Sequence, residues 1–279
     1  MYDAEYTRKF YNAYGETEWS RLEAKPYGRL QAIIHNDFIS RHVRPGDRVL
    51  DAGSGPGRFS ISLAGLGAKV TVLDISDTQL DLARTKIKEA GMTDRIERFI
   101  RADITDLRAF PDASFDTVVC FGGALSYVCE RRQKGASELV RITRPGGIIM
   151  VSVMSLLGAT LNVVVDLDML NEPSETVSGR PALWPVLETG DLPGFPSSIG
   201  IMHAPMHLYT AQELQVLFGQ CVVLETAGSN VTIGEYDGQV ETIAARPAAW
   251  KTLVELEKRI NHDSGLVNSG SHIIMAVRK

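Results

Sequence analysis

Short apolar runs alternate with amphipathic helical patterns through the middle of the chain. The β-rich runs expected to form strands are 48–53, 69–75, 95–103, 115–122, 147–153, 221–228 and 272–279. Helical patterns lie between them at 58–66, 76–91, 130–142 and 210–219. Strands that alternate with helices form βαβ units, so this order predicts a mainly parallel sheet with helices on both faces.

Three segments lie outside this alternation. Residues 1–45 have an amphipathic helical pattern with many aromatic residues, and we expect an N-terminal helical cap on a core of residues 46–153. Residues 154–209 follow the fifth strand and are expected to form a lid over the substrate. Residues 210–279 complete the core sheet and carry the further helical run PAAWKTLVELEKRI. The pattern therefore predicts an α/β fold with a seven-stranded mixed sheet, a cap and a lid.

Composition narrows the class of protein. A chain of 279 residues with 44% hydrophobic and 23% charged residues is typical of a globular protein with one large core. With 29 basic and 34 acidic residues, it offers no strong field to nucleic acid or to an anionic membrane. The three cysteines are far apart and lack CxxC spacing, which suits a reducing compartment. Because we find neither a signal peptide nor a bilayer-spanning segment, we expect a cytoplasmic protein.

The segment DAGSGPG, residues 51–57, ends the first strand and turns sharply into a helix. Glycine tolerates positive φ there, and the helix start presents N–H groups to a negatively charged group. Asp74 ends the second strand, where a carboxylate can accept both hydroxyls of a ribose. A dinucleotide fold has a similar acid, but its GxGxxG pattern needs a small residue where this chain has Arg58. The spacing therefore disfavours NAD.

Five ordered motifs extend this pattern across the core. They are VLDAGSGPGRFSISLA, VTVLDIS, ADITDL, SFDTVVCFGGALSYV and ELVRITRPGGIIMVSV. In this order and spacing they resemble the class I S-adenosylmethionine-dependent methyltransferases, over roughly residues 46–153. The resemblance implies the Rossmann-like fold of that class, S-adenosylmethionine as the cofactor and S-adenosylhomocysteine as its product.

The resemblance also implies a set of cofactor contacts at the matching positions. These are Gly53, Gly55 and Gly57 for the methionine part, Asp74 for the ribose, Asp103 for the adenine amino group, Ile75 and Ile104 for the two faces of the adenine, Phe121 and Gly122 for the floor below the sulfonium, and Asp51 and Ser54 as further contacts.

Some of these residues have simpler interpretations. Asp51 can orient the glycine loop by accepting backbone N–H bonds without touching the cofactor. Ile75 and Ile104 can be ordinary core residues. Asp103 can cap a short helix at 105–108, alone or in addition to binding adenine.

The flanks point to a subgroup. YGRLQAIIHNDF (27–38) and residues 249–279 resemble a subgroup that includes the bacterial tRNA carboxymethoxyuridine methyltransferase and small-molecule methyltransferases. In that subgroup a cap arginine reaches the methionine carboxylate, and Arg29 is the matching residue, with a solvated helix face as the alternative. Tyr14 belongs to the aromatic cap residues, which either close over the site and contact substrate or pack on the core.

The insert indicates the kind of methyl acceptor. Its charged side chains are Asp166, Asp168, Glu172, Glu175, Glu188 and Asp191 against the single base Arg180. Nucleic-acid affinity depends on phosphate contacts with clustered Lys and Arg, so this surface disfavours tRNA. Its apolar content suits a small, largely apolar acceptor, methylated on O, N, C or S. The alternatives are a tRNA wobble-uridine carboxyl methyltransferase and a non-catalytic protein that binds S-adenosylmethionine.

Methyl transfer from a sulfonium is an in-line displacement that needs close, aligned reactants. A general base is required only when the acceptor arrives protonated. The candidate catalytic residues are His207 and Tyr127, while His203 and Tyr209 are candidates for orienting the acceptor. His207 can instead be a buried hydrogen-bonding residue. His203 and His207 form an HxxxH pattern, but Pro205 breaks the helix that a metal site with this spacing needs, so no metal is expected.

Overall fold

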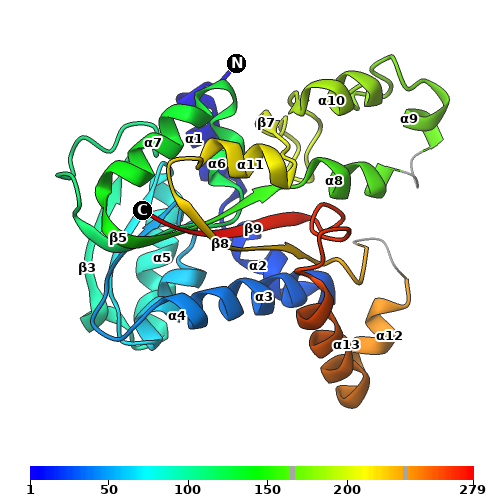
Figure 1. Ribbon diagram of the computed structural model, residues 1–279. Helices are drawn as coiled ribbons and strands as arrows, with labels where there is room; N and C mark the ends of the chain where they lie inside the picture. The colour runs from blue at the N-terminus through cyan, green and yellow to red at the C-terminus, as the bar shows by residue number, and fades with distance from the viewer. Residues whose placement is uncertain (164–166, 235–237) are drawn as a thin grey trace.

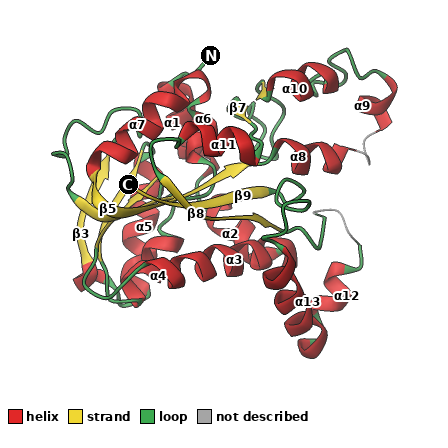
Figure 2. Cartoon of the chain, viewed as in Figure 1, coloured by secondary structure: helices red, strands yellow, loops and turns green. Residues whose placement is uncertain are grey.

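The computed structural model describes residues 1–163, 167–234 and 238–279 (Figures 1 and 2). Seven strands form one sheet in the order β3-β2-β1-β4-β5-β9-β8. The strands are β1 (Arg48–Ala52), β2 (Lys69–Asp74), β3 (Ile96–Arg101), β4 (Phe115–Cys120), β5 (Thr143–Met154), β8 (Val222–Ser229) and β9 (His272–Arg278). The first five run parallel, and β9 runs antiparallel to both β5 and β8. The predicted seven-stranded mixed sheet is confirmed.

Helices cover both faces of this sheet, which explains why the central strands are apolar runs rather than alternating ones. Helices α3 (Pro26–His42), α4 (Arg58–Gly65), α5 (Asp77–Glu89) and α13 (Pro247–Ile260) pack on one face. Helices α6 (Ala124–Tyr127), α7 (Arg132–Ile142) and α11 (Ala211–Leu217) pack on the other. Figure 2 shows the two helical layers with the sheet between them. This arrangement confirms the predicted α/β class.

The N-terminal segment forms α1 (Ala4–Tyr14) and α2 (Thr17–Ala24) before it enters α3. The side chain of Asp3 caps α1 by accepting hydrogen bonds from the backbone N–H groups of Glu5 and Tyr6. Gly28 lets α3 approach α2 closely, because a Cβ there would lie 2.2 Å from the carbonyl oxygen of Arg21. Helices α1 and α2 are therefore held beside the carboxyl ends of the parallel strands.

The insert after β5 contains α8 (Leu156–Val163), α9 (Leu167–Asn171), α10 (Leu183–Thr189) and the short antiparallel pair β6 (Asp191–Leu192) and β7 (Met206–His207). Figure 1 shows α8, α9 and α10 projecting to one side of the sheet. Asp166, one of the acidic residues noted in this insert, lies outside the described residues. The remaining elements are α12 (Val240–Ala244) and two single 3₁₀ turns, Thr93–Arg95 and Cys129–Arg131. Among the described helices, none has the length and hydrophobicity needed to span a bilayer.

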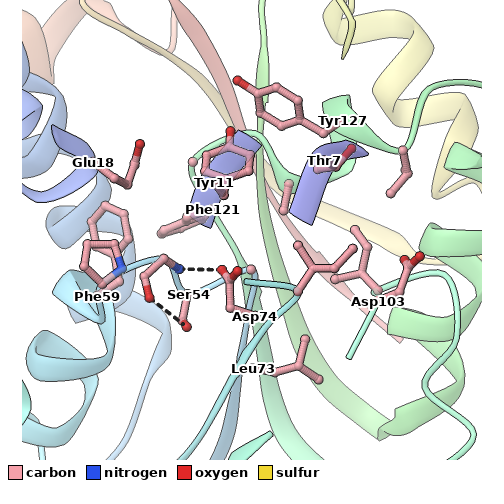
Figure 3. A pocket seen from close by; sticks show the side chains of 18 of the residues that line it. Thr7, Tyr11, Glu18, Ser54, Phe59, Leu73, Asp74, Asp103, Phe121 and Tyr127 are labelled. Atoms are coloured by element: carbon pink, nitrogen blue, oxygen red, sulfur yellow. Dashed lines mark hydrogen bonds between the residues drawn. The ribbon is translucent and has the colours of Figure 1, made fainter. Parts of the chain in front are cut away.

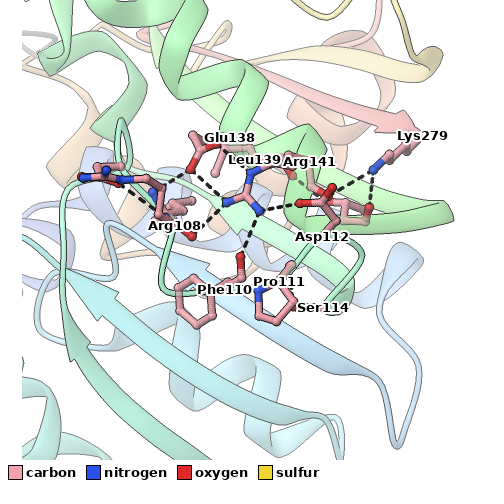
Figure 4. A network of polar contacts seen from close by, with 12 residues as sticks. Arg108, Phe110, Pro111, Asp112, Ser114, Glu138, Leu139, Arg141 and Lys279 are labelled. Atoms are coloured by element: carbon pink, nitrogen blue, oxygen red, sulfur yellow. Dashed lines mark hydrogen bonds and ion pairs between the residues drawn. The ribbon is translucent and has the colours of Figure 1, made fainter.

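Arg141 on α7 holds the connection between β3 and β4 (Figure 4). Its guanidinium donates to the carbonyl oxygens of Leu107 and Phe110, both at 2.9 Å, and to Asp112 Oδ1 at 2.7 Å. These bonds satisfy carbonyls that a helix would otherwise use. The short helix considered at 105–108 is not formed, and that prediction was wrong: residues 105 and 108 lie in turns, and 106–107 have no regular structure.

Candidate active site

The glycine segment forms a tight turn between β1 and α4. Gly53, Gly55 and Gly57 have positive φ angles of 76°, 51° and 82°. A Cβ at Gly53 would lie 2.4 Å from the Cβ of Ala124, so only glycine fits the turn there. Gly57 caps α4 and packs on Ala83 of α5, outside the lining of the cavity described below. The turn thus places backbone without side chains at the carboxyl end of β1.

Asp74 ends β2 and binds this turn. Its Oδ2 accepts a hydrogen bond from the Gly55 N–H at 2.8 Å, drawn dashed in Figure 3, and its Oδ1 accepts one from the Ser76 N–H at 2.8 Å. Burial raises the pKa of Asp74 to about 6, although the two backbone hydrogen bonds act in the opposite direction. Each carboxylate oxygen keeps a further lone pair, so the buried Asp74 can also accept hydrogen bonds from a ligand.

Asp103 follows β3 and lies at the other end of the site. Its Oδ1 accepts a hydrogen bond from the Thr105 N–H at 2.8 Å, and its Oδ2 accepts one from the Tyr2 hydroxyl at 2.8 Å. Burial and the neighbouring Asp103 raise the pKa of Tyr2, so this hydroxyl stays protonated. Ile75 and Ile104 line the same region. The arrangement of one acid between apolar side chains suits a flat ring that carries an amino group.

Two charged residues of α2 lie at the glycine end. Arg21 donates from Nε to Glu18 Oε2 at 2.8 Å and from Nη2 to Glu18 Oε1 at 2.6 Å. Burial lowers the pKa of Arg21, but the Glu18 carboxylate outweighs it and holds the pKa above its usual value. A Cβ at Gly55 would lie 3.6 Å from Glu18 Cγ, and one at Gly122 would lie 3.9 Å from Arg21 Nη2. The ion pair therefore spans the glycine turn and the end of β4.

These groups line one cavity, which holds about 840 Å³ of space together with the solvent at its mouth (Figure 3). The residues singled out in the sequence that line it are Gly53, Ser54, Gly55, Asp74, Ile75, Asp103, Ile104, Phe121, Gly122 and Tyr127. The cap adds Tyr11, one of the aromatic cap residues noted in the sequence, and residues that the sequence did not single out: Tyr2, Thr7, Glu18, Arg21 and Leu22. No motif marks these cap residues, and the excess of aromatic residues before residue 45 is the only signal that could have pointed to them.

Besides Gly57, two further expected cofactor contacts lie outside this lining. Asp51 is buried and accepts a hydrogen bond from the Ser60 hydroxyl at 2.6 Å, which ties β1 to α4, and burial raises its pKa to about 7. Arg29 lies over the ring of Trp250, 5.6 Å from its centroid. The geometry therefore favours a supporting role for Asp51, and Arg21 rather than Arg29 as the cap arginine at the site.

His207 and Tyr209 are buried away from the cavity. Asp191 Oδ1 lies 2.6 Å from His207 Nδ1, and Glu213 Oε1 lies 2.7 Å from His207 Nε2. With both ring nitrogens engaged, His207 ties β7 to β6 and α11, which favours the structural interpretation over that of a general base. The Tyr209 hydroxyl donates to the Leu125 carbonyl at 3.3 Å within the core.

Tyr14 and His203 lie in an aromatic cluster between α1 and the insert. The ring of Tyr14 stacks on Phe10 with a centroid distance of 5.5 Å and lies outside the cavity lining. The ring of His203 stacks on Phe195 at 4.6 Å and on Tyr127 at 5.8 Å. Tyr127 thus connects the cavity to the insert, and burial raises its pKa to about 12.

The central part of this chain is similar to known proteins. Residues 49–147 match the family model described as a methyltransferase domain. A demethylmenaquinone methyltransferase of Clavibacter sepedonicus is 44% identical over 115 residues, which are 40% of this chain and 44% of that protein. A malonyl-[acyl-carrier protein] O-methyltransferase of Serratia marcescens is 34% identical over 111 residues, or 40% of each chain. The matched segment is therefore less than half the length of either relative.

The fold has relatives among solved structures. A SAM-dependent methyltransferase from Methanosarcina mazei superposes with a TM-score of 0.59 and 19% sequence identity, over 87% of this chain and 96% of that one. At this level of identity the likeness concerns the fold alone. It confirms the Rossmann-like architecture predicted from the motifs.

Proposed function

We propose that this chain transfers a methyl group from S-adenosylmethionine to a small molecule, on the premise that residues 49–147 form a class I S-adenosylmethionine-dependent methyltransferase domain. The observation that carries the proposal is the spacing of charged groups along one cavity. Asp103 lies at one end, Asp74 lies in the middle, and the Glu18–Arg21 pair lies at the glycine turn.

The lining fits each part of this cofactor. Asp103 accepts from the adenine amino group, and Asp74 accepts from the ribose hydroxyls through its free lone pairs. At the far end the methionine part carries a carboxylate and an ammonium. Arg21 donates to the carboxylate and Glu18 accepts from the ammonium, so the existing ion pair presents both complementary charges. Gly53 and Gly122 leave the backbone open between them.

The charge of the cavity suits a cation. The carboxyl groups of its lining belong to Glu18, Asp74 and Asp103, against the guanidinium groups of Arg21 and Arg58. When bound, S-adenosylmethionine supplies an electrophilic methyl carbon on a positively charged sulfur. The chain's own residues hold the donor, align it with the acceptor and exclude water, and such positioning accounts for much of the rate enhancement in displacements of this kind.

The acceptor is proposed to be a small molecule. The names of the two curated relatives describe methylation of demethylmenaquinone and of malonyl-[acyl-carrier protein], so neither is described as acting on nucleic acid. Methylation of a tRNA wobble uridine and cofactor binding without catalysis are the competing interpretations, and no contact in the described residues favours either of them. The cytoplasmic location expected from the sequence also stays a prediction.

Transfer of a labelled methyl group tests the proposal. The purified chain is incubated with S-adenosylmethionine labelled in its methyl group and a panel of phenols, amines and thiols, beside a parallel reaction with bulk tRNA. We expect label in at least one small acceptor and none in tRNA. Label in tRNA, together with salt-sensitive retention of tRNA on a filter, would instead support the nucleic-acid alternative.

A further inference from the structure

A second chamber lies against the cavity on the side of α1 and the insert. It holds about 630 Å³ of space together with the solvent at its mouth, and Tyr2, Thr7 and Tyr127 line both spaces. Its other walls include Tyr6 of α1 and His203 of the insert. The two spaces therefore adjoin across these three side chains.

The hydrogen-bonding groups of the chamber are largely engaged within the protein. The Tyr2 hydroxyl donates to Asp103, the Tyr6 hydroxyl to the Met202 carbonyl, the Thr7 hydroxyl to the Asp3 carbonyl, and the Cys129 thiol to the Pro205 carbonyl. Asp3 Oδ1 accepts from the first turn of α1, and Asp3 Oδ2 is left as an acceptor among the described residues. No lysine or arginine of the described chain lines this chamber. Its one cation in the described chain is the α-ammonium of Met1, which lies 3.9 Å from Glu130 Oε2. The chamber therefore offers mainly aromatic and aliphatic contacts, and its cation is already paired with a carboxylate.

His203 provides a further free acceptor, which is neutral. Its Nδ1 lies 3.0 Å from the carbonyl oxygen of Ala204, which can only accept, so Nδ1 carries the proton. Burial lowers the pKa of His203, which keeps the ring neutral. In this tautomer Nε2 has a lone pair, and it makes no hydrogen bond to the described part of the chain. The ring itself is held by stacking on Phe195 at an interplanar angle of 6°.

On the basis of the proposed methyltransferase function, we propose that this chamber binds the methyl acceptor. The acceptor is an uncharged phenol, and His203 Nε2 accepts its hydroxyl proton. The aromatic rings around the chamber suit a planar occupant. An occupant with a hydroxyl donor complements the free acceptors of Asp3 and His203, whereas a carboxylate or phosphate would meet the Asp3 carboxylate and an ammonium that Glu130 already pairs.

The transfer balances without a further reactant. The phenol oxygen forms a bond to the methyl carbon of the donor. The bond from that carbon to sulfur breaks, and sulfur keeps the electron pair as a neutral thioether. The phenol proton passes to His203 Nε2, and the imidazolium later releases it to water.

Binding to the full chain saturated with S-adenosylhomocysteine tests this assignment without turnover. The probes, used at about pH 6 so that para-nitrophenol is mostly un-ionised, are para-nitrophenol, nitrobenzene, which lacks the hydroxyl, and para-nitrobenzoate, which is an anion. The variant His203→Phe keeps an aromatic ring but removes the acceptor, and His262→Phe, at an exposed histidine away from the chamber, is the matched control. Affinity for S-adenosylhomocysteine is measured in each sample, so that loss of the chamber and loss of the cofactor site are separated.

We expect the wild type and His262→Phe to bind para-nitrophenol and nitrobenzene but not para-nitrobenzoate. In His203→Phe the affinity for para-nitrophenol falls about tenfold or more, while nitrobenzene binds as before. Equal losses for both neutral probes, or preferred binding of the anion, overturn the inference while the proposed function stands. Failure of S-adenosylhomocysteine to bind the wild type overturns both.

Discussion

The guanidinium of Arg21 donates two hydrogen bonds to the carboxylate of Glu18, at 2.8 and 2.6 Å, where α2 crosses the glycine turn. Both side chains line the cavity, and only part of the Arg21 side chain reaches solvent. A charged pair in this position is already oriented before a ligand arrives. Substitution of Arg21 should therefore measure how much α2 contributes to cofactor binding.

Two arginine variants decide which cap arginine binds the cofactor. Arg21→Ala removes a charge-assisted donor from the cavity and should weaken the binding of S-adenosylhomocysteine about tenfold to a hundredfold. Arg29→Ala removes a guanidinium that lies over Trp250 and should leave the affinity within about twofold. Calorimetric titration of both variants measures the difference. The reverse order would restore Arg29 as the carboxylate ligand.

Cofactor affinity should fall in acid. Because the pKa of Asp74 is raised to about 6, its carboxylate is ionised above this pH and protonated below it. Protonation removes acceptor capacity and a negative charge near the ligand, so affinity at pH 5 should be about tenfold lower than at pH 8. Asp74→Asn should bind weakly at both values and lose this step. Asp51→Asn is the control, because Asp51 lies outside the lining, and persistence of the step in Asp74→Asn would contradict the assignment.

Gly53 should tolerate no side chain. Gly53→Ala forces an L-residue to a φ of 76° and places its Cβ 2.4 Å from that of Ala124. We expect a loss of about 2–4 kcal/mol in the free energy of unfolding, measured by urea denaturation. Gly65→Ala, in helix α4 with nothing within 4 Å of the added Cβ, should be neutral or stabilise by about 0.5 kcal/mol. Similar losses in both variants would argue against this account of the turn.

His207→Ala separates a structural role from a catalytic one. The substitution removes a buried ring and leaves Asp191 and Glu213 without their histidine partner. The free energy of unfolding should fall by about 1–3 kcal/mol, whereas affinity for S-adenosylhomocysteine should not change. His262→Ala, at an exposed site, should change the stability by less than about 0.5 kcal/mol. A stable His207→Ala protein with greatly reduced turnover would return His207 to the list of bases.

The core of the fold could be predicted because its strands and helices are local patterns. The run at 48–53 became β1 (Arg48–Ala52), and the pattern at 58–66 became α4 (Arg58–Gly65). The helical run PAAWKTLVELEKRI coincides with α13 (Pro247–Ile260). Each signal consists of side-chain periodicity within one segment, with glycine or proline at its ends. It can therefore be recognised from residues that are neighbours in the sequence.

Contacts between residues that are far apart in the chain could not be predicted from the sequence. Tyr2 lies 101 positions before Asp103 and donates to it, yet no periodicity connects the two. Arg21 and Arg29 both lie on helices of the cap, and only the turn between α2 and α3 decides which one faces the cavity. His207 shows the same limit, because its two carboxylate partners come from β6 and α11. Nothing in the local segment HAPMHLY indicates that both ring nitrogens are engaged.

The central claim is that the cavity beside the ends of β1, β2 and β4 binds the adenosyl and methionine parts of S-adenosylmethionine. Isothermal calorimetry of the full chain with S-adenosylhomocysteine, repeated with Asp74→Ala and with Asp81→Ala, an exposed acid on α5, measures this directly. We predict saturable binding at one site in the wild type and in Asp81→Ala, and a loss of at least about tenfold in Asp74→Ala. Absence of binding to the wild type, or equal affinity in all three proteins, would contradict the claim.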